Sequence, residues 1–160
     1  MPTIDAKYWI DRLDLQLHPE GGYFRESYRA DRRVDVDGVD RSASTAIYFL
    51  LEYGQFSALH RIKSDEVWHF YHGSPLQISA ILTGGTLSTW RLGIGVDAVP
   101  QCVVPAGAWF GAEVVDGGDF ALVGCTVAPG FEFEDFEMGD RDRLAAGFPA
   151  YIDLIKRLTS

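Results

Sequence analysis

His60 and Glu66 are the two side chains of this sequence whose types and spacing best suit proton-transfer chemistry. An imidazole titrates near neutral pH, and a neighbouring carboxylate can orient it or favour its charged form. Residues of equal parity project from the same face of an extended segment, so both side chains should face one interior. The pattern predicts a site in which His60 is the base and Glu66 orients it.

The same parity argument predicts aromatic walls for a pocket around this pair. Trp68 and Phe70 share the parity of Glu66 and should face the same interior. Tyr48, on the segment before His60, is the best candidate for a complementary acid. Aromatic residues in strands more often pack in a core, so the structural interpretation of Tyr48 is the stronger one. His60 also has a structural alternative, as a buried histidine satisfied by Glu66.

A second candidate region is the segment His18-Pro19-Glu20-Gly21-Gly22-Tyr23-Phe24-Arg25-Glu26. Its two glycines permit backbone angles closed to other residues, and a turn that enters the first strand explains them. In the functional alternative, Glu20, Tyr23 or Arg25 reaches the mouth of the pocket or pairs across a dimer. Spacing alone does not choose between these roles.

Most of the chain alternates short apolar runs with turn residues, which is typical of an all-β sandwich or barrel. We expect strands near 100–104, 108–115, 119–127 and 131–136. The clearest hairpin has a two-residue turn at Gly84-Gly85. Helices are expected at about 4–14, with Thr3 as the N-cap, and at about 148–158. The charged segment 31–44 is interpreted as a plain connection rather than a lid.

Composition limits the classes of function. A length of 160 residues with 47% hydrophobic residues suits one globular domain, 1–160. The formal net charge of −9 argues against a nucleic-acid partner, because binding to phosphates draws on clustered Lys and Arg. We expect a cytoplasmic protein without membrane contact, since no run approaches a membrane span and no secretory signal is visible. Cys102 and Cys125 lie outside any CxxC pair, which fits a reducing compartment.

Two motifs resemble those of the cupin superfamily. The first cupin motif, G-x5-H-x-H-x3-E-x6-G, is matched by Gly54, His60, Glu66 and Gly73, with Ile62 in place of the second histidine. The second, P-x-G-x2-H, falls on Pro105 to Phe110, where phenylalanine replaces the histidine. The segment His18 to Glu26, together with Val123 to Phe133, resembles a small cupin family of uncharacterised function.

This resemblance implies a double-stranded β-helix, or jelly roll, with a barrel over about 17–137, short terminal helices and an interior pocket. It also implies a homodimer. Phe110, at the position of a ligand histidine, would add an apolar wall to the pocket. Only His60 and Glu66 of the metal ligands are left, and catalytic zinc sites usually carry three protein ligands, so we expect no metal cofactor. A weak divalent site at those two residues is the alternative.

Three classes of function follow. The first is a small-molecule-binding cupin that acts as a metal-independent isomerase, epimerase or lyase through His60 and Glu66. The second is a ligand-binding or sensing module without turnover. The third is a metal-dependent cupin with a reduced ligand set. The sequence identifies neither the ligand nor whether catalysis occurs.

Overall fold

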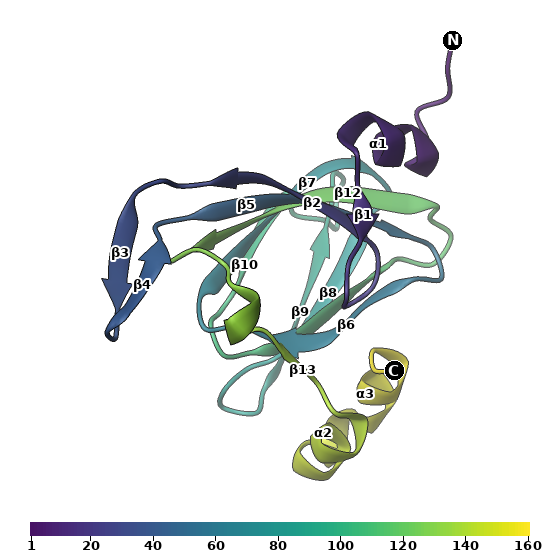
Figure 1. Cartoon of the computed structure of the whole chain (residues 1–160). Coiled ribbons are helices and arrows are strands. Elements are labelled where there is room, and N and C mark those ends of the chain that lie inside the picture. Colours follow the sequence, from purple (N-terminus) through teal and green to yellow (C-terminus); the bar gives the residue numbers. More distant parts are fainter.

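Alternating buried and exposed residues along the strands build two antiparallel sheets that face each other, as Figure 1 shows. The structure, a computed structural model, describes residues 1–160. The larger sheet has the order β1-β2-β5-β12-β7-β10, with bounds Gln16–Leu17, Tyr23–Arg29, Thr45–Glu52, Phe120–Ala128, Asp65–Gly73 and Gln101–Val104. The second has the order β13-β6-β11-β8-β9, with bounds Glu137–Met138, Phe56–Arg61, Trp109–Val114, Leu76–Ile81 and Leu87–Leu92.

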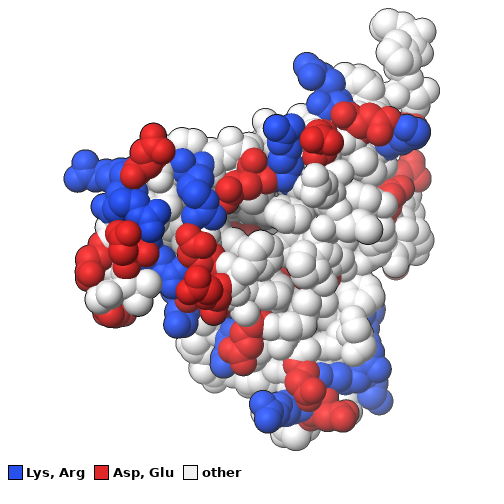
Figure 2. All heavy atoms as spheres, in the orientation of Figure 1, with Lys and Arg blue, Asp and Glu red and all other residues white.

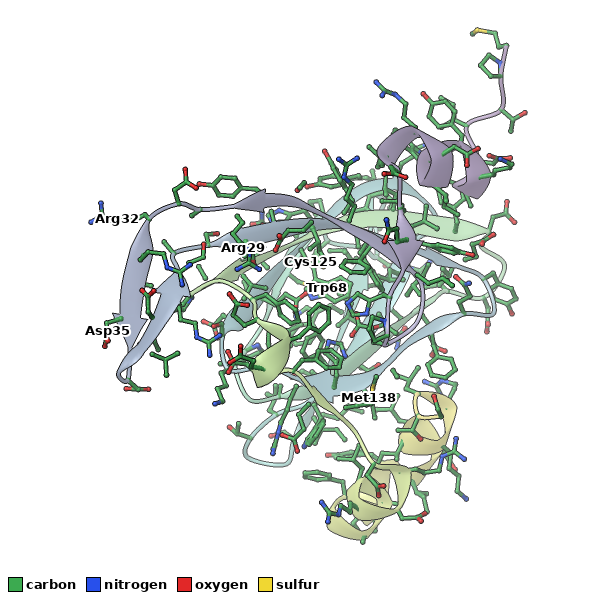
Figure 3. The ribbon with its side chains drawn as sticks, in the orientation of Figure 1. Arg29, Arg32, Asp35, Trp68, Cys125 and Met138 are labelled. Carbon is green, nitrogen blue, oxygen red and sulfur yellow. The ribbon has the colours of Figure 1, made fainter.

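The main core fills the space between these two sheets. It contains 18 buried residues, among them Phe49 of β5, Trp68 of β7, Ile78 of β8 and Phe110 of β11. Figure 3 shows Trp68 and Cys125 between the two layers of strands. This arrangement is the all-β jelly roll with terminal helices that the sequence predicted.

The terminal helices cover the outside of the sheets. Helix α1, Ala6–Leu13, packs on the outer face of the larger sheet against Leu50 and Leu122. Its N-cap is Asp5 rather than Thr3, since the Asp5 carboxylate accepts from the backbone N–H of Tyr8. At the other end the chain forms α2, Arg141–Gly147, the 3-10 turn η2, Pro149–Tyr151, and α3, Ile152–Arg157. The expected C-terminal helix is therefore shorter, and α2 precedes it.

Three local expectations differ from the structure. Segment 31–44 is not a plain connection but contains a projecting hairpin of β3, Arg33–Val36, and β4, Val39–Ser42. Its turn is Asp37-Gly38, and both residues have positive φ, as a type I′ turn requires. Segment 131–136 is not a strand, because it contains the 3-10 turn η1, Phe133–Asp135. In the β8–β9 turn only Gly85 has positive φ, so the expected two-residue primed turn is not formed.

Charged side chains on the face shown in Figure 2 interleave in sign over β2, β3 and β4. Arg29 pairs with Glu26 and Glu132, and Arg33 pairs with Asp40. Arg29 and Arg33 are therefore neutralised by acidic neighbours rather than gathered into a basic patch. None of the helices is both long enough and apolar enough to cross a bilayer.

Candidate functional site

The segment 18–22 buries a carboxylate beside β6. Gly21 has a φ of +109°, and a side chain there would meet the Phe56 carbonyl oxygen at 2.2 Å, so only glycine permits this close approach. The Ala58 N–H donates to the Glu20 carbonyl oxygen at 2.8 Å, which fixes the segment to the strand. The Glu20 N–H in turn donates to Nδ1 of His18 at 3.0 Å. The two glycines therefore have a structural role, and that role places Glu20 in the interior.

Strand β6 presents His60 to this carboxylate. Nδ1 of His60 lies 2.7 Å from Oε2 of Glu20 and 2.7 Å from the carbonyl oxygen of Ala58. The Ala58 carbonyl oxygen and the Glu20 carboxylate both face Nδ1, so both stabilise a proton on this nitrogen. Both side chains are buried, at 4% and 8% exposure. With Nδ1 engaged in this way, Nε2 is the ring nitrogen left for a bound molecule.

Burial and charge act in opposite directions on this pair. Burial alone would lower the pKa of His60, but the charge and hydrogen bonding of Glu20, with the charge of Glu66, raise it above its usual value. Burial alone would raise the pKa of Glu20, but His60, with a smaller effect of His18, lowers it overall. Both shifts favour the imidazolium–carboxylate form of this buried pair.

Glu66, on β7, is the second buried carboxyl group of the site, with 8% exposure. Burial raises its pKa to about 7, against the opposing effect of His60, while the Glu20 carboxylate raises it further. The neighbouring Cys125 thiol on β12 lowers this pKa slightly, and burial raises the pKa of the thiol well above its usual value. Glu66 thus exists in both protonation states near neutral pH, which is the condition for efficient proton exchange.

These three groups share one cavity of about 220 Å³. Most of its other walls are apolar and come from β2, β5, β12 and the segment that follows β12. The remaining lining residues are His18, Phe24, Glu26, Arg29, Thr45, Ile47, Ile62, Cys125, Val127, Phe131, Glu132, Phe133 and Phe136. The Phe136 ring stacks on the His60 imidazole, with centroids 5.1 Å apart and planes at 23°.

Arg29 fixes the mouth of this cavity. It donates to both carboxylate oxygens of Glu26, at 2.7 and 3.3 Å, to Glu132 at 2.7 Å and to the Phe131 carbonyl oxygen at 2.9 Å. The Phe131 N–H donates to Thr45 at 2.9 Å. These bonds hold the segment 129–136 over the cavity, so that its phenylalanines line the site. Figure 3 labels Arg29 and Cys125, which also line it.

Comparison with known proteins gives the family. Residues 7–139 match the sequence profile Cupin_5, described as cupin superfamily (DUF985). The chain belongs to the cupin superfamily. The structure is similar to protein SO0799 from Shewanella oneidensis, at 38% identity, with a TM-score of 0.91 and coverage of 99% of both chains. It is also similar to a hypothetical protein from Leishmania major, at 38% identity and a TM-score of 0.92, covering 97% of this chain and 98% of that one.

A yeast relative extends the same picture. The uncharacterized protein YML079W of Saccharomyces cerevisiae is 26% identical over 150 residues, which is 84% of this chain and 75% of the yeast protein. None of these three names states an activity. The function of this cupin is therefore argued from the site itself.

The residues of this cupin do not fit the metal centre that the superfamily implies. Ile62, where the second motif histidine belongs, lines the cavity as an apolar residue. Phe110 pairs in register with His60, and its ring centroid lies 4.2 Å from that of the imidazole. Nδ1 of His60 is engaged by Ala58 and Glu20, and no three His, Cys, Asp or Glu side chains converge in a geometry that could hold a metal ion.

The aromatic residues expected in the pocket wall occupy other places. Trp68 and Phe110, each 1% exposed, lie in the core but do not line the cavity. Phe70 packs against the same core. Parity gave the correct side of the sheet for all three. The cavity, however, lies at the end of the barrel that segment 129–136 closes. Of the residues of β7 only Glu66 lines it, and the residues after Glu66 lie beyond it.

Tyr23 and Tyr48 do not face the cavity, which corrects their expected role. Both pack with α1 on the outer face of the larger sheet. The register explains this, because Phe24 of β2 and Ile47 of β5 line the cavity and their immediate neighbours must point the other way. Of the expected site residues, the structure brings together Glu20, His60 and Glu66.

Sequence reasoning missed His18, Arg29 and the phenylalanines after β12. His18 is two residues from Glu20 in the motif His18 to Glu26, and its ring packs on Phe24 at 4.5 Å. Burial lowers the pKa of His18, so it is neutral beside the charged pair. The motif could have predicted His18 as a site residue, because it also contains Glu20. Phe136 had no such signal, because its contact with His60 depends on the path of an irregular segment.

Proposed function

We propose that this cupin binds a small organic molecule beside His60 and transfers a proton on it without a metal. The observation that carries the proposal is the cavity of about 220 Å³ in which a buried imidazolium–carboxylate pair adjoins a second carboxyl group with a pKa raised to about 7. Two carboxyl groups whose environments separate their pKa values are the usual mark of acid–base catalysis.

Each group then has a defined role. Glu66 takes a proton from the bound molecule and returns it, since it exchanges protons most readily near neutral pH. His60, held charged by Glu20, offers Nε2–H to the atom on which negative charge develops. This reverses the roles expected from the sequence, because Glu20 is the carboxylate 2.7 Å from the imidazole. Isomerase, epimerase and lyase reactions can all begin with such a step.

The proposal also includes the partners and compartment expected from the sequence. The outer face of the larger sheet exposes Tyr28, Tyr71 and Val103, and we propose that two copies pair through this face as a homodimer. The buried thiols of Cys102 and Cys125 are unpaired, which supports a reducing cytoplasmic compartment.

A screen that separates binding from turnover tests the proposal. Compounds that raise the melting temperature of the wild-type protein are incubated with it in D2O, and deuterium incorporation is followed by mass spectrometry. Glu66→Gln should retain ligand binding and lose exchange by at least about 100-fold. Glu113→Gln, which changes a carboxylate on β11 paired with Arg157, is the matched control and should behave as wild type. Ligands that bind without exchange would make the protein a binding module.

A further inference from the structure

The size of the cavity limits what it can hold. Its volume of about 220 Å³ is below the range of about 300 to 1,000 Å³ that holds drug-sized ligands. A nucleotide or a nucleotide-linked sugar is too large to be enclosed here.

The walls favour an apolar body. Phe24, Phe131, Phe133 and Phe136 line the cavity together with the aliphatic side chains of Ile47, Ile62 and Val127. Edge-on and stacked rings of this kind gain most from a flat or aliphatic surface. A sugar with hydroxyl groups on every carbon would leave several of them facing phenylalanine, without a hydrogen-bond partner.

The charges at the cavity disfavour an anion. Its lining carries four carboxyl groups, Glu20, Glu26, Glu66 and Glu132, against one guanidinium and the imidazolium of His60. Four of the five N–H donors of the Arg29 guanidinium bind Glu26, Glu132 and the Phe131 carbonyl, so an incoming phosphate would compete with both carboxylates for it. Phosphate sites instead provide free Arg or Lys, or a helix N-terminus. Lys63, outside the cavity, pairs with Asp135.

We infer that the molecule bound beside His60 and Glu66 is a compact uncharged carbonyl compound with an apolar body and a hydrogen on the carbon next to the carbonyl. This inference rests on the proposed function and names its substrate class. The engaged Nδ1 of His60 leaves Nε2–H for the carbonyl oxygen, and Glu66 shares the cavity as the base.

The chemical step balances without any other reactant. The Glu66 carboxylate takes the proton from the α-carbon, and the electron pair of that C–H bond forms a carbon–carbon double bond. The carbonyl π electrons move to oxygen, which accepts the proton of His60 Nε2 to give an enol, a protonated Glu66 and a neutral His60. The enol then reprotonates at carbon from Glu66, while its hydroxyl proton returns to His60. Return of the proton by Glu66 to the same face of the α-carbon restores the compound with that hydrogen exchanged for one from solvent. In a β,γ-unsaturated carbonyl compound the enol is a dienol, and return of the proton to its γ-carbon gives the conjugated isomer.

A matched pair of probes tests the substrate class. Phenylacetone and phenylpyruvate share a benzyl ketone body, and a methyl group in the first stands where the second has a carboxylate. We expect wild-type protein to bind phenylacetone at least about tenfold more tightly by titration NMR, because the carboxylate must enter a net negative cavity. Glyceraldehyde 3-phosphate, as the phosphorylated probe, should not bind at millimolar concentration. Glu132→Gln should reduce the ratio of the affinity for phenylacetone to that for phenylpyruvate, because it removes one negative charge from the cavity lining.

Deuterium exchange at the α-carbon of phenylacetone in D2O then tests the proton-transfer function separately from the class of ligand. Faster exchange with wild-type protein than with Glu66→Gln supports both. Tighter binding of phenylpyruvate or of the phosphorylated probe overturns the substrate class, and so does a failure of phenylacetone to bind. Tight phenylacetone binding with equal exchange in wild-type and Glu66→Gln protein leaves the class of ligand standing and overturns the proton-transfer function.

Discussion

At the scale of single residues, Glu20 and Glu66 share one cavity but differ in charge at neutral pH. His60 holds the pKa of Glu20 below its usual value, whereas burial and the Glu20 carboxylate raise the pKa of Glu66 to about 7. The difference arises from geometry, because Glu20 lies 2.7 Å from the imidazole. This separation underlies the roles assigned to the two groups.

The stability of a Glu66→Gln variant should reveal the raised pKa. The pKa of Glu66 is higher in the folded chain than in the unfolded one, so its contribution is fully present below about pH 4.5 and is lost as pH rises through about 7. The groups that act on it are His60, Glu20 and Cys125. Glutamine mimics the protonated form, so the variant should match wild type at pH 4 and exceed its free energy of unfolding by about 3 kcal/mol at pH 8.

Urea unfolding at both pH values measures this difference. An equal effect of the substitution at pH 4 and pH 8 would show that Glu66 has an ordinary pKa. The gain in stability should accompany a loss of proton exchange, which is the trade-off expected of a strained functional group.

Substitution of Glu20 should have the opposite effect on stability. Glu20→Gln leaves the buried imidazolium without its negative partner, so the pKa of His60 should fall and the protein should lose about 3 kcal/mol at neutral pH. NMR titration of the His60 ring and urea unfolding measure the two effects. Glu137→Gln is the control, because its pair with Arg61 is exposed and should contribute less than about 1 kcal/mol. Equal losses in both variants would contradict the assignment.

At the scale of elements, two arginines hold the irregular segment after β12 in place. Arg29 of β2 binds Glu132 and the Phe131 carbonyl, and Arg41 of β4 forms a largely buried ion pair with Asp135 of η1. The hairpin that projects to one side in Figure 1 thereby contributes to the closure of the cavity. The Arg41–Asp135 pair therefore explains why a charged hairpin lies beside the cavity.

Loss of the Arg41 contact should loosen that segment selectively. Arg41→Gln leaves Asp135 with only the exposed Lys63, at 3.6 Å, so amide hydrogen exchange over 131–138 should rise at least tenfold, with a stability loss of about 2 kcal/mol. Arg33→Gln is the matched control in the same hairpin, because the Arg33–Asp40 pair is exposed. Unchanged exchange over 131–138 in Arg41→Gln would show that the hairpin does not hold the segment.

Sequence patterns predict the regular elements better than the irregular ones. Strand alternation gave β10, β11 and β12, and the Gly84-Gly85 pair gave the β8–β9 hairpin, because local propensity and burial agree there. The same alternation failed over 131–136, where Phe131 and Phe133 pack on the cavity from an irregular backbone. The motifs predicted Glu20, His60 and Glu66 as site residues. Which carboxylate contacts the imidazole depends on the close approach of Gly21 to Phe56, and no local pattern encodes it.

At the scale of the whole molecule, the chain retains the cupin jelly roll but has apolar residues at two positions of the metal site, Ile62 and Phe110. The vacated position is filled by packing, since the Phe110 ring contacts the His60 imidazole. The site therefore depends on the barrel for burial, which raises the pKa of Glu66. Added divalent ions should not change the melting temperature, and calorimetric titration with Mn²⁺ or Zn²⁺ checks this. A stabilisation lost in His60→Ala would reinstate a metal site.

The exposed outer face of the larger sheet gives the prediction for assembly. Wild-type protein should sediment at twice the chain mass of 17.8 kDa, and Val103→Lys, which places a charge on that face, should sediment as a monomer. Helix α1 covers the other end of the face, so Ile4→Lys near the N-terminus is the control. A wild-type monomer at micromolar concentration would contradict the homodimer.

Carbon-13 NMR titration of the glutamate side-chain carboxyl groups measures the two pKa values on which the proton-exchanging role of Glu66 depends. With Glu20→Gln and Glu66→Gln spectra to assign the signals, Glu66 should titrate with a midpoint near 7, and Glu20 should stay ionised below its ordinary pKa of 4.5. A Glu66 midpoint near 4.5, or a Glu20 that takes up its proton at higher pH than Glu66, would contradict the assignment of Glu66 as the proton-exchanging group of the cavity.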